Sequence, residues 1–409
     1  MTTQQRYVIV GGGLAAATAA ETLREQGFGG SVVMLTVEED LPYERPVLSK
    51  GYLLGSEERQ SAFIHDQQWY DDHDIEVRLG AMATGINRDQ GVVGLEGGEQ
   101  VPYDRLLLAT GSWPRRIDVP GADLEGVLYL RDLPEADRIK QAIEGGGPLV
   151  VVGAGWIGLE IAAAAREHGV SVTVLEAAPL PLQRVLGDEV ARVFADLHRR
   201  HDVDLRLGVG IGSIVGEDGK VTGVVAADGS RIDATAVVVG IGATPQVEIA
   251  QAAGLECDNG ILVDAQLRTS DPDIFAAGDI AAVDHPVLGR RVRVEHWAMA
   301  NDSGPVAAQS MLGQDAMFDA LPFFYTDQYD LGMEYIGYAE PGDVDRVVLR
   351  GDVAGLAFQA FWLGAGRVLA GMHVNMWDDG IDPIKELVAS GRTVDADKLG
   401  DPSIALGDV

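Results

Sequence analysis

The sequence has a single cysteine, Cys257, among its 409 residues. One thiol excludes an intrachain disulfide, and it excludes cysteine-rich zinc or iron–sulfur sites, because each of these needs two or more thiolates. It also favours a reduced, cytoplasmic location. Cys257 lies in an acidic turn that is expected to raise its pKa, so we expect a structural residue and not a reactive thiolate.

Basic residues are scarce as well. The 31 Lys and Arg residues compare with 63 Asp and Glu residues, which gives a formal net charge of −32. A field of this sign opposes binding to nucleic acid or to an anionic membrane surface. No charge-free apolar stretch reaches about 18 residues, so a membrane-spanning helix is not expected. The uncharged run from Tyr7 to Ala20 has the length of a signal-peptide core, but its glycines favour another interpretation.

Glycine, in contrast, is abundant, with 52 residues, and it occurs in two similar motifs. The β-branched run Val8–Val10 leads into Gly11-x-Gly13-x-x-Ala16 and an alanine-rich helical segment. Val150–Val152 leads into Gly153-x-Gly155-x-x-Gly158 and a second helical segment, which ends at Gly169. Each motif therefore follows a predicted strand and opens a predicted helix, which is the context of a dinucleotide-binding turn.

The spacing has a physical reason. The first glycine permits a tight turn, the second lets backbone N–H groups approach a pyrophosphate, and the third small residue lets helix and strand pack closely. Two copies predict an α/β protein with two Rossmann-like domains, and 409 residues leave room for two or three domains in all. Two dinucleotide sites in one chain suggest two cofactors that exchange electrons.

Acidic residues follow both motifs where a ribose would need a hydrogen-bond acceptor. Glu176 ends the strand after the second motif, and its carboxylate would repel a 2′-phosphate, so NADH is preferred over NADPH. The alternative for Glu176 is a solvated glutamate at a strand end. After the first motif, the acid is either Glu38 or Glu39.

A third signal indicates a flavin. The apolar run Ile274–Ala277 ends in Gly278-Asp279, where the carboxylate can hold a ribityl hydroxyl and the glycine leaves room for the chain. Similar exits from a strand into glycine occur at Thr110-Gly111 and at Gly242.

Together with Arg45–Lys50 and Glu295–Trp297, these motifs carry a resemblance over essentially the whole chain. The sequence resembles the FAD-dependent, NADH-linked ferredoxin reductases of bacterial oxygenase systems, which have a glutathione-reductase-like fold. The resemblance implies an FAD domain made of residues 1–114 and 244–319, with an NAD domain, 115–243, inserted between them. An α+β C-terminal interface domain, 320–409, follows.

The resemblance also implies roles for individual residues. Lys50 would lie beside the reactive edge of the flavin, where a cation stabilises negative charge on the reduced ring. Glu160 would pair with Lys50 and contact the nicotinamide amide, and the alternative is an acid on the helix surface. The full set expected to bind FAD is Gly11, Gly13, Leu14, Ala15, Ala16, Glu38, Arg45, Lys50, Ala83, Thr110, Gly111, Arg131, Gly278, Asp279 and Trp297. The set expected to bind NAD is Gly153, Gly155, Trp156, Ile157, Gly158, Glu160, Glu176, Arg184 and Gly242.

The implied activity is hydride transfer from NADH to FAD, followed by single-electron transfer to a small 2Fe–2S ferredoxin that serves an oxygenase. The segment Leu41–Leu54 carries no cysteine pair, which argues against a disulfide reductase. Two alternatives stay open: the same flavin chemistry with oxygen, a quinone or an organic radical as acceptor, and a redox switch like apoptosis-inducing factor. Tyr325 stands where relatives commonly have tryptophan, which puts the docking of a partner in doubt.

Ferredoxins are typically acidic, so a chain of this net charge needs a local basic patch to bind one. Arg290, Arg291 and Arg293 are the best candidates. No metal site is expected. His198 and His201 are spaced to share one helix face, but the arginines between them oppose a cation, so we expect a solvated face.

Overall fold

The computed structural model describes residues 4–409, which form two compact units. Unit 1 consists of the chain up to Glu44 with Arg59–Trp113 and Thr244–Pro322. Unit 2 consists of Arg45–Glu58, Pro114–Ala243 and Phe323–Val409. The short strands β8 (Ser112–Pro114) and β17 (Ala243–Pro245) lie where the chain passes from one unit to the other.

Unit 1 contains a five-stranded parallel sheet in the order β20-β7-β1-β2-β3. The strands are β1 (Arg6–Val10), β2 (Ser31–Leu35), β3 (Ile75–Arg78), β7 (Arg105–Leu108) and β20 (Ile274–Ala276). The first glycine motif connects β1 to helix α1 (Leu14–Glu25). Apolar runs such as Val8–Val10 are buried, as expected for parallel strands covered on both faces. The run considered as a signal-peptide core is thus a central strand and its helix.

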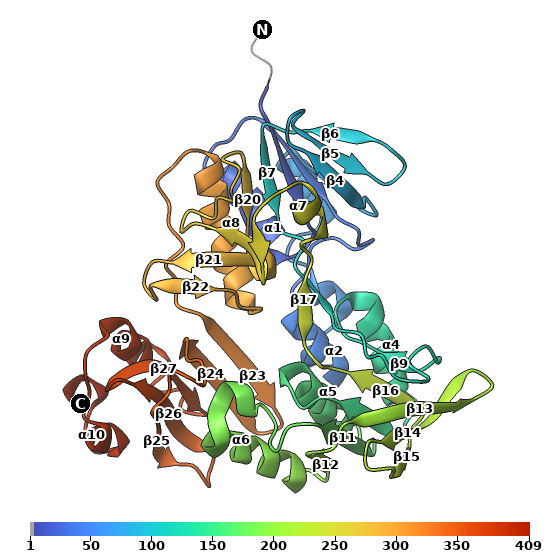
Figure 1. Ribbon diagram of the computed structural model, residues 1–409, viewed down its shortest axis with the longest axis vertical. Helices are drawn as coiled ribbons and strands as arrows, with labels where there is room; N and C mark the ends of the chain where they lie inside the picture. Colours follow the sequence, from blue (N-terminus) through green and yellow to red (C-terminus); the bar gives the residue numbers. More distant parts are fainter. Residues whose placement is uncertain (1–3) are drawn as a thin grey trace. The chain divides into compact units, whose positions relative to one another are not determined.

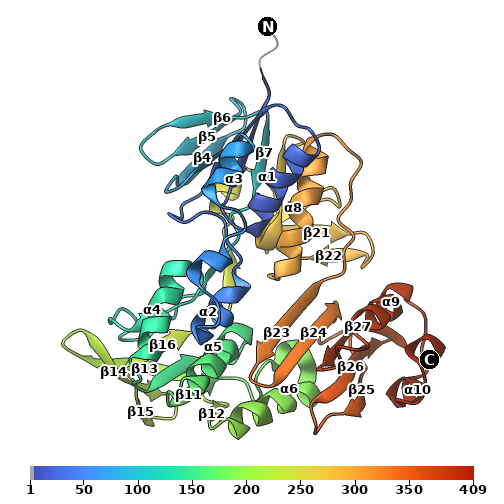
Figure 2. The same cartoon turned by 180° about the vertical axis from the view of Figure 1, so that it is seen from behind.

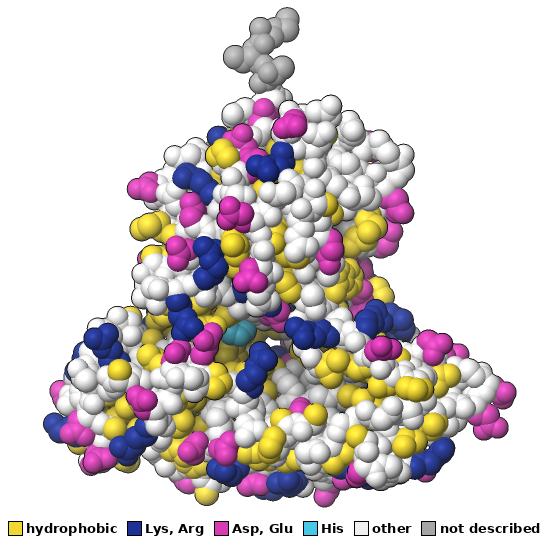
Figure 3. Space-filling view, viewed as in Figure 1, with side chains coloured by type: hydrophobic (Ala, Val, Ile, Leu, Met, Phe, Trp, Pro, Cys, Tyr) yellow, Lys and Arg dark blue, Asp and Glu magenta, His cyan; other side chains and the backbone are white. Residues whose placement is uncertain are grey.

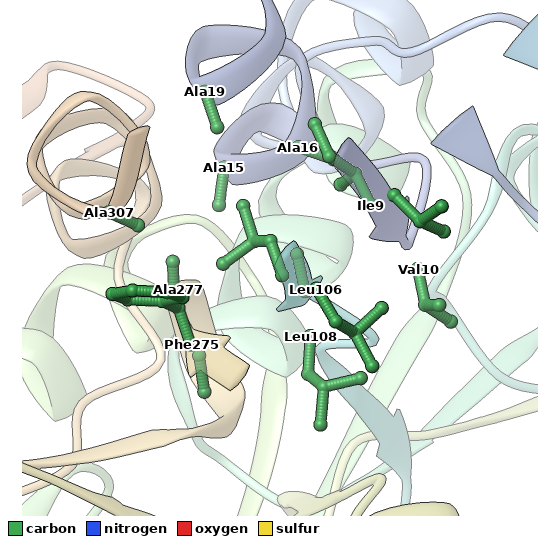
Figure 4. Packing of buried hydrophobic residues seen from close by; sticks show 14 of the residues in the cluster. Ile9, Val10, Ala15, Ala16, Ala19, Leu106, Leu108, Phe275, Ala277 and Ala307 are labelled. Carbon is green, nitrogen blue, oxygen red and sulfur yellow. The ribbon is translucent and has the colours of Figure 1, made fainter. Parts of the chain in front are cut away.

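Helices α1 and α8 (Trp297–Met311) lie side by side in unit 1 (Figures 1 and 2). Small residues allow the close approach: Ala15 and Ala19 of α1 face Ala307 of α8 (Figure 4). Gly304 leaves no space for a side chain against α1, because a Cβ there would lie 2.1 Å from Thr18 Oγ1 and 2.6 Å from the Ala15 carbonyl oxygen.

The rest of unit 1 consists of two smaller sheets and short helices. One sheet is antiparallel, with β4 (Ala83–Asn87), β5 (Val92–Leu95) and β6 (Gln100–Pro102). The other has the order β18 (Cys257–Asp258), β19 (Gly260–Val263), β21 (Ala281–His285) and β22 (Arg290–Val292). The short helices are α3 (Gln67–Asp72) and α7 (Glu248–Ala252).

Unit 2 contains a second parallel sheet, in the order β12-β11-β10-β16-β9. Its strands are β9 (Val127–Leu128), β10 (Leu149–Val152), β11 (Val172–Glu176), β12 (Asp204–Leu207) and β16 (Ala236–Val239). The second glycine motif connects β10 to α5 (Trp156–Glu167). Its other elements are α2 (Gly51–Leu54), α4 (Leu133–Glu144), α6 (Gln183–Arg200), and the antiparallel β13 (Ile211–Glu217), β14 (Lys220–Ala226) and β15 (Arg231–Asp233).

The C-terminal part of unit 2 forms a five-stranded antiparallel sheet in the order β23-β24-β27-β26-β25, with its helices drawn in red in Figure 2. The strands are β23 (Phe323–Gln328), β24 (Leu331–Gly337), β25 (Arg346–Asp352), β26 (Ala357–Gly364) and β27 (Arg367–Val374), and the helices are α9 (Asp382–Ser390) and α10 (Ala396–Gly400). The predicted fold class, two Rossmann-like α/β domains plus an α+β part, is confirmed. Within residues 4–409, no helix has the length and apolar character needed to cross a bilayer.

The α1–α8 contact leads to a stability prediction. Gly304→Ala should lower the free energy of unfolding by about 2 kcal/mol, because the added methyl has no space between the helices. Gly85→Ala is the matched control, since a Cβ at Gly85 meets no atom within 4 Å. Chemical denaturation followed by circular dichroism measures both variants, and equal stability of the two would contradict the packing argument.

Candidate active site

The first glycine motif forms a turn that only glycine can adopt. Gly11 has φ +141°, and a Cβ there would lie 2.1 Å from the Ala109 carbonyl oxygen. A Cβ at Gly12 would lie 2.3 Å from Thr36 Oγ1. Gly13 begins α1, and the space beside its Cα is open, with no atom of the described chain within 4 Å of a built Cβ. An uncapped helix N-terminus beside open space fits a bound pyrophosphate.

The helix end keeps its shape because the following residues are buried. Leu14, Ala15 and Ala16 are all buried in the first turn of α1, and Ala15 and Ala16 pack into the core of unit 1. Ala16 is fully buried, which agrees with the expected close packing of helix on strand.

Of the two acids after β2, Glu38 is the one held in place. Its carboxylate accepts a hydrogen bond from the buried Tyr43 hydroxyl at 2.5 Å, and its backbone N–H donates to Thr36 Oγ1 at 3.2 Å. Glu39 is exposed. A carboxylate fixed at the carboxyl end of a strand suits a ribose, so Glu38 stays our prediction for the FAD ribose.

The Gly278-Asp279 exit lies beside the N-terminus of α8. Gly278 has φ +73°, and its N–H donates to the Ser303 hydroxyl at 2.9 Å. The Asp279 carbonyl oxygen accepts from the Arg293 guanidinium at 2.9 Å. Burial lowers the pKa of His296 to about 4, against the opposing influence of Asp279, so this imidazole is neutral at pH 7. The Trp297 indole donates to Glu44 Oε2 at 2.7 Å.

The remaining unit 1 residues of the predicted FAD set lie at strand ends. The Thr110 hydroxyl donates to the Gln246 carbonyl at 3.0 Å, and the Gln246 N–H donates to the Gly111 carbonyl at the same distance. Ala83 begins β4 and is half-buried. Arg45 and Arg131, in contrast, belong to unit 2, where the Arg45 guanidinium donates to the Arg131 carbonyl.

The second glycine motif repeats the turn in unit 2. Gly153 has φ +100°, and a Cβ there would lie 2.4 Å from the Gly240 carbonyl oxygen. A Cβ at Gly158 would lie 2.2 Å from the Gly153 carbonyl oxygen, so this position must be glycine for α5 to approach β10. Gly155 begins α5 without a side-chain cap from the described residues, which again suits a phosphate.

The side chains after this turn point in different directions. Trp156 packs against Phe194 and Phe324, with ring centroids 5.6 and 4.9 Å away. Ile157 is 46% exposed, so its apolar side chain is available to a ligand. Arg184 is exposed on α6, and Gly242, with φ +103°, accepts the Arg115 N–H at 2.9 Å.

Glu176 is anchored by backbone and is not simply solvated. Its two carboxylate oxygens accept the N–H groups of Ala154 and Ala178, each at 2.7 Å. A carboxylate has about four acceptor positions, so two backbone donors leave capacity for ribose hydroxyls. Glu176 is therefore a partly buried strand-end glutamate with a fixed carboxylate, and its role in binding ribose stays a prediction.

The two residues expected to act in catalysis lie together in unit 2. Lys50, between the turn Pro46–Ser49 and α2, places Nζ 2.7 Å from Glu160 Oε1. Glu160 is 5% exposed, so the alternative of an acid on the helix surface is wrong. The Lys50 ammonium also lies 5.3 Å from the centre of the Tyr325 ring. Burial raises the pKa of the nearby Asp327, and Lys50 opposes that rise.

Two hydroxyl groups that donate hydrogen bonds to the Glu160 carboxylate were not predicted from the sequence. The Ser49 hydroxyl donates to Glu160 Oε2 at 2.5 Å, and the Thr326 hydroxyl donates to Glu160 Oε1 at 2.6 Å. Ser49 was within reach of sequence reasoning, because it precedes Lys50. Nothing in the spacing of the sequence connects Thr326 to Glu160.

His198 and Cys257 have surroundings that differ from those expected. His198 is fully buried and bonds Gln328, so the expectation of a solvated face is wrong there, whereas His201 stacks on Tyr329. Cys257 is half-buried, and burial is what raises its pKa. Residues 4–409 include no group of three or more His, Cys, Asp or Glu arranged to hold a metal ion.

The arginines of the expected basic patch are partly used inside unit 1. Arg293 donates to Glu295 at 2.7 Å as well as to the Asp279 carbonyl, and its side chain is 10% exposed. Arg291 donates to the carbonyls of Val263 and Ala282 at 3.1 and 2.7 Å. Both guanidinium groups therefore form hydrogen bonds within unit 1 that a substitution would break.

Comparison with known proteins identifies the class. A family model described as pyridine nucleotide-disulphide oxidoreductase matches residues 5–304, and one described as reductase C-terminal matches residues 323–409. The chain belongs to the pyridine nucleotide-disulphide oxidoreductase family. It is thus an oxidoreductase that binds FAD and uses NAD(H).

Individual relatives are similar over almost the whole chain. The ferredoxin–NAD(+) reductase component of the anthranilate 1,2-dioxygenase system of Burkholderia cepacia is 40% identical, over 98% of each chain. Rhodocoxin reductase of Rhodococcus erythropolis is 40% identical, over 90% of this chain and 86% of its own. The crystal structure of the covalent putidaredoxin reductase–putidaredoxin complex matches with a TM-score of 0.94 and 35% identity, over 98% of this chain and 97% of that one. The resemblance to ferredoxin reductases is confirmed.

Glu176 allows a test of nicotinamide choice. Glu176→Gln removes the charge but keeps an amide oxygen that can accept one of the two backbone N–H groups. Loss of the repulsion toward a 2′-phosphate should raise the ratio of kcat/KM for NADPH to that for NADH about tenfold, or about 1.4 kcal/mol. Steady-state kinetics with both nucleotides measures the ratio. An unchanged ratio in a stable variant would remove Glu176 from nucleotide selection.

Proposed function

We propose that this protein is an NADH-dependent, FAD-containing ferredoxin reductase that passes electrons to a 2Fe–2S ferredoxin serving a bacterial oxygenase. The observation that carries the proposal is the ion pair between Lys50 and the buried Glu160, which lies in the helix that the second glycine motif opens. The names of two relatives, which are the ferredoxin–NAD(+) reductase components of an anthranilate 1,2-dioxygenase system and a p-cumate 2,3-dioxygenase system, support the same activity.

In this proposal, the FAD domain comprises residues 1–114 and 244–319, the NAD domain 115–243 and the C-terminal interface domain 320–409. FAD would be held at the Gly11–Gly13 turn, Glu38, Asp279 and Trp297. The uncapped start of α1 would bind its pyrophosphate. We also place the protein in the cytoplasm, in keeping with its single thiol and its use of NADH.

The residues of unit 2 have the complementary task of binding and orienting NADH. Backbone N–H groups at the start of α5 bind the pyrophosphate, and Glu176 accepts hydrogen bonds from the adenosine ribose. Glu160 holds the nicotinamide amide, and Lys50 supplies a positive charge next to it. When bound, FAD accepts a hydride and can release two electrons one at a time, which links NADH to a one-electron carrier.

The cysteine content separates this protein from disulfide and persulfide chemistry. A NAD-dependent persulfide reductase from A. fulgidus has a similar structure, with a TM-score of 0.86 and 26% identity. This chain has only Cys257, in β18, and burial raises the pKa of that thiol. A half-buried thiol with a raised pKa is a poor nucleophile, so thiol exchange is not the activity that we propose.

The proposal is tested with cytochrome c as the final acceptor. NADH-dependent cytochrome c reduction should become fast only when a 2Fe–2S ferredoxin is added, and oxygen consumption without a carrier should stay slow. Fast oxygen consumption would instead show an oxidase. Slow flavin reduction with or without ferredoxin would favour a redox switch and overturn the reductase assignment.

Lys50 can be tested by removing its charge. Lys50→Met should slow flavin reduction by NADH about a hundredfold while FAD stays bound, because a positive charge near the developing negative charge is lost. Stopped-flow absorbance measures the rate. The control is Lys140→Met in α4, because Lys140 also lies over an aromatic ring, Tyr52 at 4.3 Å, but has no proposed role. Equal rates in both variants would remove Lys50 from the mechanism.

The basic patch can be tested at Arg290, which leaves the structural contacts of Arg291 and Arg293 in place. Acidic and basic side chains both appear over the face shown in Figure 3, so docking of an acidic ferredoxin would depend on local charge. Arg290→Glu should raise the apparent KM for ferredoxin about fivefold at low salt, without changing flavin reduction by NADH. Arg231→Glu, on β15, is the control with the same change of charge. If both variants keep the wild-type KM, Arg290 is not part of the docking surface.

A further inference from the structure

The buried face of β23 carries a row of polar side chains that the mechanism above does not use. Thr326 and Gln328 are each 1% exposed, and both lie on the same side of the strand as Phe324. Gln328 Nε2 lies 3.1 Å from Thr326 Oγ1, and His198 Nε2 lies 2.9 Å from Gln328 Oε1. The Thr326 hydroxyl donates a hydrogen bond to Glu160 Oε1, so this row of hydrogen-bonded side chains connects His198 to the Glu160 carboxylate.

The direction of every hydrogen bond in this row is fixed by the carboxylate. A carboxylate oxygen only accepts, so the single hydrogen of the Thr326 hydroxyl points to Glu160. Thr326 Oγ1 must then accept from Gln328, which has to present its N–H groups to the threonine. The amide oxygen of Gln328 is left for His198, which must carry its proton on Nε2.

His198 is suited to this single arrangement. Burial lowers its pKa to about 4, so the imidazole is neutral and carries one proton at pH 7. Its Nδ1 is buried without a hydrogen-bond partner among the described residues, which means that a proton there would have no acceptor. The neutral tautomer with hydrogen on Nε2 is therefore the favoured one, because it alone donates a hydrogen bond to Gln328 Oε1.

We propose that Thr326, oriented by Gln328 and His198, is a positioning residue that holds Glu160 in the orientation needed at the nicotinamide. Glu160 receives three donors: Ser49 on one oxygen, and Lys50 and Thr326 on the other. Thr326 is the donor that is itself fixed by further buried groups. The inference rests on the proposed function, because it takes the role of Glu160 from there.

The test compares Thr326→Val, which keeps the shape and removes the hydroxyl, with Thr326→Ser, which keeps the hydroxyl. Removing a buried hydrogen bond to a charged group costs enough free energy to lower a rate about tenfold. Thr326→Val holoenzyme should therefore show flavin reduction by NADH about tenfold slower than wild type in stopped flow, and Thr326→Ser should recover most of the rate. Thr222→Val in β14 is the control, since its hydroxyl bonds the Val215 carbonyl of the same hairpin and has no proposed role.

A binding measurement gives a readout other than turnover. Calorimetric titration of the oxidised holoenzymes with NAD⁺ should give a dissociation constant about threefold higher for Thr326→Val than for wild type, because a misoriented Glu160 contacts the amide less well. On a Glu160→Gln background the same substitution should change neither the rate nor the binding further, since Thr326 acts through that carboxylate.

Three results would overturn the inference: wild-type rates in Thr326→Val, equal defects in the valine and serine variants, or a full additional loss on the Glu160→Gln background. Equal defects would mean that packing of the side chain matters and not its hydroxyl. The proposed function is judged separately, by ferredoxin-dependent electron transfer in the wild-type protein. A wild type that reduces its flavin but not a ferredoxin would overturn that function and leave the Thr326 comparison valid.

Discussion

The organisation of unit 2 depends on one requirement: a carboxylate buried inside a protein must be surrounded by donors. Glu160 is placed on the inner side of α5 by the second glycine motif, where it is almost inaccessible to water. Its donors come from outside its own domain segment, from Ser49 and Lys50 before it and from Thr326 after it. The three segments of unit 2 are thus joined at a single charged group.

The glycine turns impose the second constraint. Each brings a helix N-terminus against the end of a parallel strand so closely that a Cβ would overlap a carbonyl oxygen, Ala109 for Gly11 and Gly240 for Gly153. The same closeness leaves the backbone N–H groups at the start of the helix open to a ligand. The same turn therefore packs tightly against the neighbouring strand and leaves the helix N-terminus open to a ligand.

Sequence reasoning succeeded where the chemistry is local. A motif such as Gly11-x-Gly13-x-x-Ala16 contains its strand, turn and helix within a few residues, so both Rossmann-like sheets could be predicted. The Lys50–Glu160 proximity came from a family resemblance and not from spacing, because 110 residues separate the two side chains. Thr326 was missed for the same reason. His198 was misjudged because neighbouring arginines suggested a solvated face, while burial against β23 is decided by tertiary packing.

The segmented construction of unit 2 also has a consequence for how the chain folds during synthesis. The strand that provides Thr326 is made 166 residues after Glu160. A ribosome adding about 5–20 residues per second therefore needs roughly ten to thirty seconds to supply it. During that interval the Glu160 carboxylate on α5 lacks the Thr326 hydrogen bond, while strands β11, β12 and β16 of the NAD-binding sheet are being made. The NAD-binding segment can fold early, but the Glu160 carboxylate has all three of its donors only after β23 has been synthesised.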